Sequence, residues 1–281
     1  MKFFVKSQTP STALYHYTSA RSISEILDSR VLWASSVHCM NDAEEYIYAF
    51  TLTRELCARP DIIPPHMAAA ILQSLDNDYR GVEMLSKFIT SFSEDGDLLS
   101  QWRAYTGGGP GFSLGFEPEG LLTIAERNEC LLLKCIYGRD DQVAAVQDLL
   151  YQIIDHYCID PSSGCLPPRF GNSFVRALKD LAAAFKDPSF IEEREWRLVT
   201  PSLPSAGEHV HFRPGISLLI PYVHVRIADE CEPIPISSAI VGPTVRPELS
   251  RLTLLDAFAT YGCTAISESV INSKSPYRGW W

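Results

Sequence analysis

The pattern that decides the fold begins with the stretch LYHYTS, residues 14–19. Its aromatic and β-branched side chains predict a short strand, and Ser19 predicts a helix N-cap at the strand's end. Apolar residues spaced three and four apart then predict a helix over residues 20–28. A second short strand is expected over residues 31–35. The chain therefore opens with strands and a helix packed close together in sequence.

The rest of the chain mixes short strands with helices in no regular alternation, which favours an α+β domain. Further strands are predicted over residues 88–93, 112–116, 131–137, 196–200, 216–225, 236–241 and 264–270, and helices over 42–60, 98–105, 142–157, 174–185 and 253–261. We expect a single domain over residues 1–281, with helical insertions near 60–87 and 140–187. No Gly-x-Gly-x-x-Gly follows a strand and no Walker-type Gly-Lys-Ser occurs, which argues against Rossmann and P-loop nucleotide sites.

Composition restricts the class of protein further. The chain of 281 residues is 46% hydrophobic and 21% charged, as expected for a packed globular protein, and its formal net charge is -10. An acidic surface disfavours broad, nonspecific binding to nucleic acid. The eight cysteines form no Cys-x-x-Cys pair, which favours free thiols in a reducing cytosol. No signal-peptide core and no membrane-spanning apolar run is seen, so we expect a cytoplasmic protein without membrane contact.

His16 is the first candidate functional residue. Period-two geometry puts His16 and Thr18 on the same face of their strand, where the pair can point into a cleft together. Such side chains can hydrogen-bond a ribose hydroxyl and a carboxamide. A histidine satisfied within the core is the alternative that this pattern leaves open.

A second candidate is the charged stretch EEREWR, residues 192–197. In a strand, Glu193, Glu195 and Arg197 share one face, and Trp196 lies on the other. Two carboxylates beside arginines can act as a general base and stabilise developing positive charge. A solvated edge strand with paired charges is the alternative.

The third candidate combines Ser91 and Ser93 with the helix that follows them. Trp102 and Tyr105 lie three apart and so share a helix face, where they can stack on a nicotinamide ring, and Arg103 can meet a phosphate. Aromatic pairs at this spacing also commonly belong to a core.

Histidines suggest a different class of site. His209 and His211 are expected on one strand face, with His224 nearby, which would give two imidazole ligands for a metal. No firm third ligand accompanies them.

Taken in order, the motifs resemble those of the bacterial family known as domain of unknown function 2971. The motifs are LYHYTS at residues 14–19, LW at 32–33, NDAEE at 41–45, SFS at 91–93, QWRAY at 101–105, GFSLGF at 111–116, EREWR at 193–197, IVGP at 240–243 and SPYR at 275–278. That family is in turn distantly similar to the ADP-ribosyltransferase fold. This second similarity implies a split, mixed β-sheet core with flanking helices and a helical insertion.

The resemblance also implies roles for the candidate residues. His16, with Tyr17 and Thr18, would hold NAD, and Ser91, Ser93, Trp102, Arg103 and Tyr105 would complete the cofactor site. Glu195 would stabilise the oxocarbenium-like transition state, with Glu193 as its catalytic partner. The middle motif SFS departs from the Ser-Thr-Ser of the transferases.

The function expected from this resemblance is an NAD-dependent ADP-ribosyltransferase or an NAD glycohydrolase, acting as a bacterial toxin or phage-defence effector. The partners implied are NAD, a macromolecular acceptor (protein or nucleic acid) and a regulatory protein. Two alternatives stay open. One is a non-catalytic nucleotide- or partner-binding module on a degenerate transferase fold, and the other is a metal-dependent hydrolase using His209 and His211.

Overall fold

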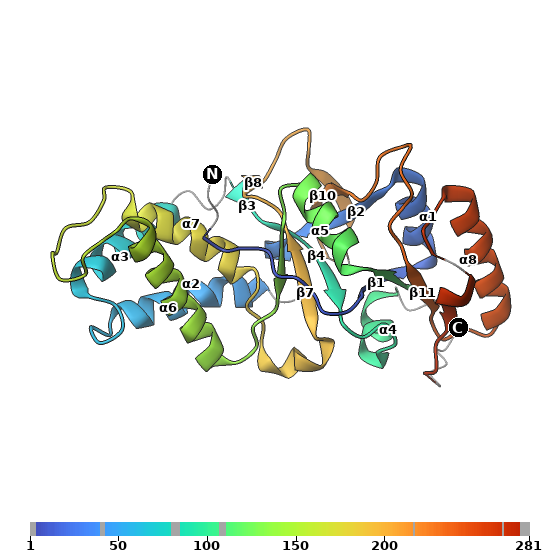
Figure 1. The fold of residues 1–281 in the computed structure, drawn as a ribbon, viewed down its shortest axis with the longest axis horizontal. Coiled ribbons are helices and arrows are strands. Elements are labelled where there is room, and N and C mark those ends of the chain that lie inside the picture. The colour runs from blue at the N-terminus through green and yellow to red at the C-terminus, as the bar shows by residue number, and fades with distance from the viewer. Residues whose placement is uncertain are drawn as a thin grey trace.

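The protein is a mixed α/β structure with a central, mostly antiparallel sheet flanked by helices (Figure 1). The computed structural model describes residues 4–39, 43–79, 85–106, 111–215, 217–265 and 267–275. The sheet order is β12-β11-β5-β1-β4-β2-β10-β9, and β7 and β6 extend from β4 as a branch.

The strands of this sheet are β1 (Leu14–Ser19), β2 (Val31–Ser36), β4 (Phe88–Ser93), β5 (Gly111–Phe116), β6 (Leu131–Lys134), β7 (Glu195–Val199), β9 (His211–Pro214), β10 (Leu219–Arg226), β11 (Ser238–Val241) and β12 (Val270–Asn272). A separate small pair joins β3 (Leu85–Ser86) to β8 (Leu203–Pro204). The α-helices are α1 (Ala20–Ser29), α2 (Ala43–Cys57), α3 (Pro65–Tyr79), α4 (Leu99–Tyr105), α5 (Pro118–Arg127), α6 (Arg139–His156), α7 (Phe170–Ala182) and α8 (Pro247–Tyr261). The 3₁₀ turns are η1 (Val37–Cys39), η2 (Pro188–Glu193) and η3 (Ser267–Ser269).

The sheet divides at β4. One edge of β4 pairs with β7 along five residues, whereas its other edge pairs with two different strands. Ile89, near the start of β4, lies opposite Ser35 of β2, and Ser93, at its end, lies opposite Tyr15 of β1. Between these two pairings, β1 and β2 diverge and leave a split beside the middle of β4.

Side chains fill the split where the backbone ladder is interrupted. Thr90 Oγ1 donates to the carbonyl of Trp33, at 3.2 Å, from the β2 side. His16 Nδ1 lies 3.0 Å from the carbonyl oxygen of Ser91, on the β1 side. These bonds satisfy backbone acceptors that a neighbouring strand would otherwise bind.

Two hydrophobic cores use opposite faces of the central strands. The first core contains Phe92 and Trp196, together with apolar residues of α1, α5 and α8. The second core contains Ile89 and Val199, and it joins the sheet to the helices α2, α3, α6 and α7. These helices form the lobe on the left of Figure 1, and α3, α6 and α7 fall within the ranges where helical insertions were expected.

The N-terminal segment runs along the outer edge of β6. The amide of Gln8 donates to the carbonyl of Leu132, at 2.8 Å, and the amide of Leu132 donates to Ser7 Oγ. The side chain of Gln8 accepts from the amide of Lys134. The segment therefore covers an edge of the sheet that β7 does not pair.

Many of the expected elements are confirmed. The strand over residues 88–93 has the predicted bounds, and Ser19 caps α1 by accepting from the amide of Ser22. Helix α5 was not predicted, although Pro118 at its first position and apolar residues three and four apart signal it. The last strand lies at 270–272 and not at 264–270. Residue 42, where the helix over 42–60 was expected to begin, lies outside the described residues.

Two further findings concern membranes and thiols. Within the part of the chain that the structure describes, no helix is long and apolar enough to cross a bilayer. The cysteines are free, as expected; Cys57, Cys130 and Cys135 are buried, whereas Cys158, Cys165 and Cys231 are exposed.

Helices α3 and α7 approach each other closely at Gly171. A Cβ atom added there would clash with the carbonyl oxygen of Ala70 and with Ser74 Oγ. We predict that Gly171→Ala lowers the unfolding free energy by about 1 to 3 kcal/mol, because overpacking forces the two helices apart. Urea unfolding measures the effect. Gly120→Ala in α5 is the matched control, since its Cβ meets only Pro235 at an ordinary 3.5 Å, and equal losses in both variants would contradict the packing argument.

Candidate functional site

Four charged side chains meet beside β7, on the sheet face to which Glu195 and Arg197 point. We call Lys186, Glu193, Glu195 and Arg197 the Lys186 cluster. Lys186 Nζ lies 2.5 Å from Oε2 of Glu193 and 2.5 Å from Oε2 of Glu195. Arg197 Nε donates to Glu195 Oε1 at 2.9 Å, and Arg197 Nη2 donates to Glu195 Oε2 at 3.1 Å. Two cations and two carboxylates therefore neutralise one another.

The cluster is closed to solvent. The side chains of Lys186, Glu195 and Arg197 are 1%, 5% and 3% exposed. Arg197 Nη1 also donates to the carbonyls of Ala183 and Phe185, just after α7. The cluster thus ties the end of a lobe helix to the central sheet, and it differs from the solvated edge strand that was the alternative.

Opposing effects set the ionisation of Glu195. Burial alone would raise its pKa, but the charges and hydrogen bonds of Arg197 and Lys186 hold its pKa at about 2. For Lys186, burial alone would lower the pKa, and Glu195 is the main group that raises it above the usual value. Both groups are therefore charged at neutral pH.

The predicted alternation of this stretch is confirmed in β7. Glu195 and Arg197 point to one sheet face, and Trp196 points to the other. Glu193 precedes the strand, in η2, and reaches the same cluster through Lys186.

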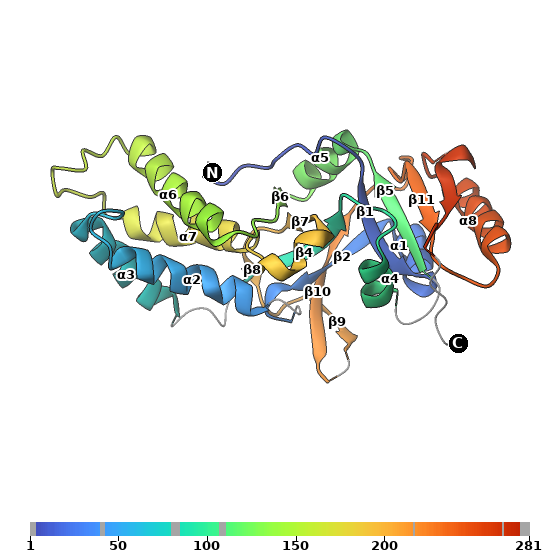
Figure 2. The ribbon, with the colours of Figure 1, turned by 90° about the horizontal axis from the view of Figure 1, so that it is seen from below.

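The sheet face that carries Glu195 also carries the two serines of β4. Ser93 lies directly opposite Glu195, and Ser91 lies opposite Arg197. Residues directly opposite in an antiparallel pair share a face. We call this side of the sheet the Ser91 face. Figure 2 shows α4 on the side toward which the β9–β10 hairpin of the sheet extends, with α5 on the opposite side.

His16 and Thr18 do not point onto the Ser91 face. Tyr15 lies opposite Ser93, so strand alternation turns His16 toward the other face, where its ring is 5.7 Å from that of Phe92. Thr18 is 4% exposed. The expectation that both side chains enter a cleft together is therefore wrong, because the pleat directs Thr18 into the interior.

The half-buried imidazole of His16 hydrogen-bonds the backbone carbonyl of Ser91 at the split between β1 and β2. Burial lowers its pKa, although the hydrogen bond to the Ser91 carbonyl opposes that shift. A neutral ring with Nδ1–H donating to the carbonyl fits this environment, which corresponds to the satisfied core histidine that the sequence left open.

Tyr17 and Trp102 are structural residues on the Ser91 face. Their rings pack edge to face, with centroids 4.7 Å apart. The Tyr17 hydroxyl donates to the carbonyl of Asp95 and accepts from the amide of Leu98, and Trp102 Nε1 donates to Asp97 Oδ1 at 2.8 Å. Trp102 is 2% exposed, so the expectation that it stacks on a nicotinamide ring is wrong.

The remaining candidates differ in accessibility. Tyr105 is 42% exposed and does not share the buried environment of Trp102. Arg103 is also exposed, and Ser91 is half-buried. Ser93 is buried, and its hydroxyl donates to the carbonyl of Glu193 at 2.7 Å. Ser91, Arg103 and Tyr105 are therefore the predicted cofactor residues on this side that solvent reaches.

Two rings that the sequence did not single out, Trp33 and Tyr222, lie beside His211 and His224 on β2, β10 and β9. Trp33 and Tyr222 stack with centroids 4.4 Å apart, and His211 and His224 stack at 4.2 Å. Trp33 lies opposite His224, and Tyr222 lies opposite His211, so all four rings share one face. The alternation of polar and apolar residues along 219–226 signals this face, but only the strand pairing brings Trp33 to it.

His209, His211 and His224 line one cavity of about 530 Å³. His209 precedes β9, and its Nε2 lies 3.1 Å from the carbonyl oxygen of Pro204. Across the described ranges, no three His, Cys, Asp or Glu side chains come together as a metal site.

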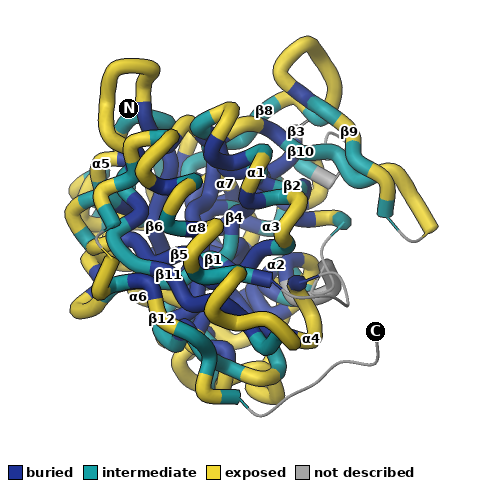
Figure 3. Tube along the Cα trace, turned by 90° about the vertical axis from the view of Figure 1, so that its right-hand side faces the viewer, coloured by how far each residue is buried: buried dark blue, intermediate teal, exposed yellow. Residues whose placement is uncertain are grey.

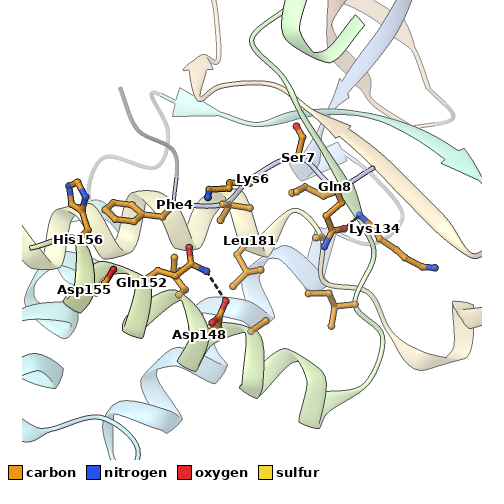
Figure 4. Close-up of a pocket in the computed structure, with 16 residues that line it drawn as sticks. Phe4, Lys6, Ser7, Gln8, Lys134, Asp148, Gln152, Asp155, His156 and Leu181 are labelled. Carbon is orange, nitrogen blue, oxygen red and sulfur yellow. Dashed lines mark hydrogen bonds between the residues drawn. The ribbon is translucent and has the colours of Figure 1, made fainter. Parts of the chain in front are cut away.

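A cavity of about 650 Å³ lies elsewhere, beneath the N-terminal segment (Figure 4). Phe4 and Lys6 border it on one side, and Gln152 and His156 of α6 border it on the other. None of the predicted site residues lines it among the residues described.

The fold and the site define a mixed α/β protein whose split sheet carries polar and aromatic side chains beside a closed ionic cluster. Residues 101–198, from α4 to the end of β7, match the family described as Protein of unknown function (DUF2971). This match confirms the family expected from the motifs for this stretch. No curated protein and no solved structure matches the chain.

We predict that Glu195→Gln lowers the unfolding free energy at pH 7 by about 3 to 5 kcal/mol, because it leaves buried cations without compensation. Urea unfolding measures the loss. Glu55→Gln is the control, since it removes an exposed partner of Arg139 and has little effect.

The stability difference between the native protein and Glu195→Gln is expected to depend on pH. The folded pKa of Glu195 lies below its ordinary value of 4.5, so its stabilising contribution is complete above pH 4.5 and is lost as pH falls toward 2. The stability difference between the native protein and Glu195→Gln therefore shrinks over that range. A difference that stays constant would contradict the charge argument.

Proposed function

We propose that the protein binds NAD on the Ser91 face, between α4 and the strands β2 and β10. The split in the sheet carries this proposal. It places the half-buried Ser91 beside a gap in the ladder, with the exposed Arg103 and Tyr105 on the α4 side and Trp33 on the β2 side.

These side chains suit the chemical parts of a dinucleotide. A serine hydroxyl can hydrogen-bond a ribose or carboxamide, and aromatic rings can stack on a heterocycle. A guanidinium matches the geometry of phosphate oxygens. Because the chain has a net charge of -10, a dianionic pyrophosphate needs such a local cation to bind.

The geometry favours NAD binding without a catalytic role for Glu195. A carboxylate that stabilises a developing oxocarbenium ion must approach the ribose and present its negative charge. Both oxygens of Glu195 already contact Lys186 or Arg197, and the side chain is 5% exposed. The protein is accordingly a nucleotide-binding module in which the Lys186 cluster holds the sheet and the lobe together.

We predict that Arg103→Gln weakens NAD binding about tenfold, the loss expected when a charge-assisted hydrogen bond to phosphate is removed. Isothermal titration calorimetry with NAD measures the change. Arg139→Gln is the matched control, because Arg139 is an exposed arginine of α6 paired with Glu55. Equal affinities in the native protein and Arg103→Gln would contradict the proposed site.

ADP-ribosyl transfer or NAD hydrolysis is the second candidate function. One observation favours it: Glu195 is ionised, lies on the Ser91 face and is only one strand away from the serines. In that reaction the C–N bond to nicotinamide breaks and its electron pair leaves with nicotinamide. A protein, nucleic-acid or water nucleophile then bonds to the ribose and loses its proton, and Glu193 is the second carboxylate of the site. A toxin or phage-defence role belongs to this candidate.

The two functions differ in the release of nicotinamide. For the binding module, we predict no release above the uncatalysed rate when the native protein is incubated with NAD, measured by chromatography. Release from the native protein that is lost in Glu195→Gln, with folding checked by circular dichroism, would establish the second candidate instead. Addition of cell lysate as a source of acceptors is the control for a missing co-substrate.

A further inference from the structure

We propose that the rings of Trp33, Tyr222, His211 and His224, the ring array, bind the adenine base of the nucleotide, and that Arg213 binds its phosphate. This inference rests on the proposed function and adds a base-recognition subsite to it. The ring array spans three neighbouring strands. Trp33 stacks on Tyr222 and His211 stacks on His224, whereas Tyr222 is tilted against the two histidines, with centroids 5.5 and 5.7 Å away.

The array is accessible. Tyr222, Trp33 and His211 are half-buried, and His224 is exposed. Figure 3 shows the β9–β10 hairpin projecting from the body of the molecule, and along its strands residues of intermediate burial are interspersed with exposed ones. Rings that only fill a core would be covered on both sides, whereas these remain in contact with solvent. Partly exposed aromatic faces are the usual platform for a base, because each base offers a flat π-surface.

A cation stands beside the rings. Arg213 lies in β9 opposite Ile220, diagonal to Tyr222 of β10, and its Nη2 donates to Ser35 Oγ at 3.1 Å. Burial is the main cause of the raised pKa of Tyr222, and the positive charge of Arg213 acts in the opposite direction. Ser35 thus orients a guanidinium whose remaining donors can bind phosphate. An aromatic stack beside an oriented guanidinium recognises a base that carries a phosphate.

The array also adjoins the Ser91 site. The carbonyl of Trp33 accepts from Thr90, the neighbour of Ser91, at the split. A ligand over Ser91 therefore meets Trp33 on the adjoining strand β2, and the other rings follow on β10 and β9. The charge of the chain favours a single nucleotide over a polynucleotide, since many phosphates would meet a protein of net charge -10 and Glu25 lies near Tyr222.

The test is calorimetric titration with AMP. We expect Tyr222→Leu to weaken AMP binding about tenfold, within the range for loss of one stacked base. Tyr151→Leu is the matched control, because Tyr151 is a 62% exposed tyrosine of α6 in the helical lobe. Arg213→Gln, which keeps all four rings, should weaken binding of AMP and leave binding of adenosine unchanged. Thermal unfolding of each variant confirms that the fold persists.

Competition distinguishes the source of the nucleotide. AMP that displaces NAD supports a subsite for the adenylate half of NAD, whereas simultaneous binding of both overturns it. Unchanged AMP affinity in both Tyr222→Leu and Arg213→Gln overturns the ring array as a base site. A loss of AMP affinity in Tyr222→Leu supports the base site, whatever the result for Arg103→Gln. An NAD affinity unchanged by Arg103→Gln would contradict only the proposed function.

Discussion

The neutralisation of buried charge at Lys186 is the constraint on which the rest of the structure depends. An ammonium group removed from water is costly unless carboxylates surround it, and Glu193 and Glu195 supply two. Because Lys186 follows α7 while Glu195 begins β7, their pairing fixes the helical lobe against the sheet. Arg197 strengthens this connection by donating to carbonyls at the end of α7. The helical lobe and the sheet therefore meet along a polar seam in which two cations and two carboxylates neutralise one another.

A second constraint is the divergence of β1 and β2 beside β4. Each strand continues its own hydrogen-bond ladder elsewhere, with β5 and β10 respectively. In the gap, the side chains of His16 and Thr90 make the hydrogen bonds that the backbone of a continuous strand would make. The middle of β4 consequently borders a gap in the backbone ladder and not another strand, and Ser91 lies beside that gap.

Local pattern predicted much of this arrangement. The β-prone run at 88–93 and the alternation of Glu195 with Trp196 follow from side-chain periodicity alone. The burial of Glu195 does not, because Lys186 comes from a separate loop whose position depends on tertiary packing. The sheet face to which His16 points does not follow from periodicity either, because it is set by the pairing of Tyr15 with Ser93. The addition of Trp33 and Tyr222 to His211 and His224 was not predicted for the same reason: Trp33 and Tyr222 lie far apart in sequence and meet only across a strand pair.

The N-terminal segment along β6 has a consequence for the order of folding. Its partner for Ser7 lies 125 positions later in the chain, so the loop that must close is long. During synthesis Ser7 and Gln8 emerge well before the strand they bind. They therefore lack these hydrogen-bond partners until residues 131–134 have been made.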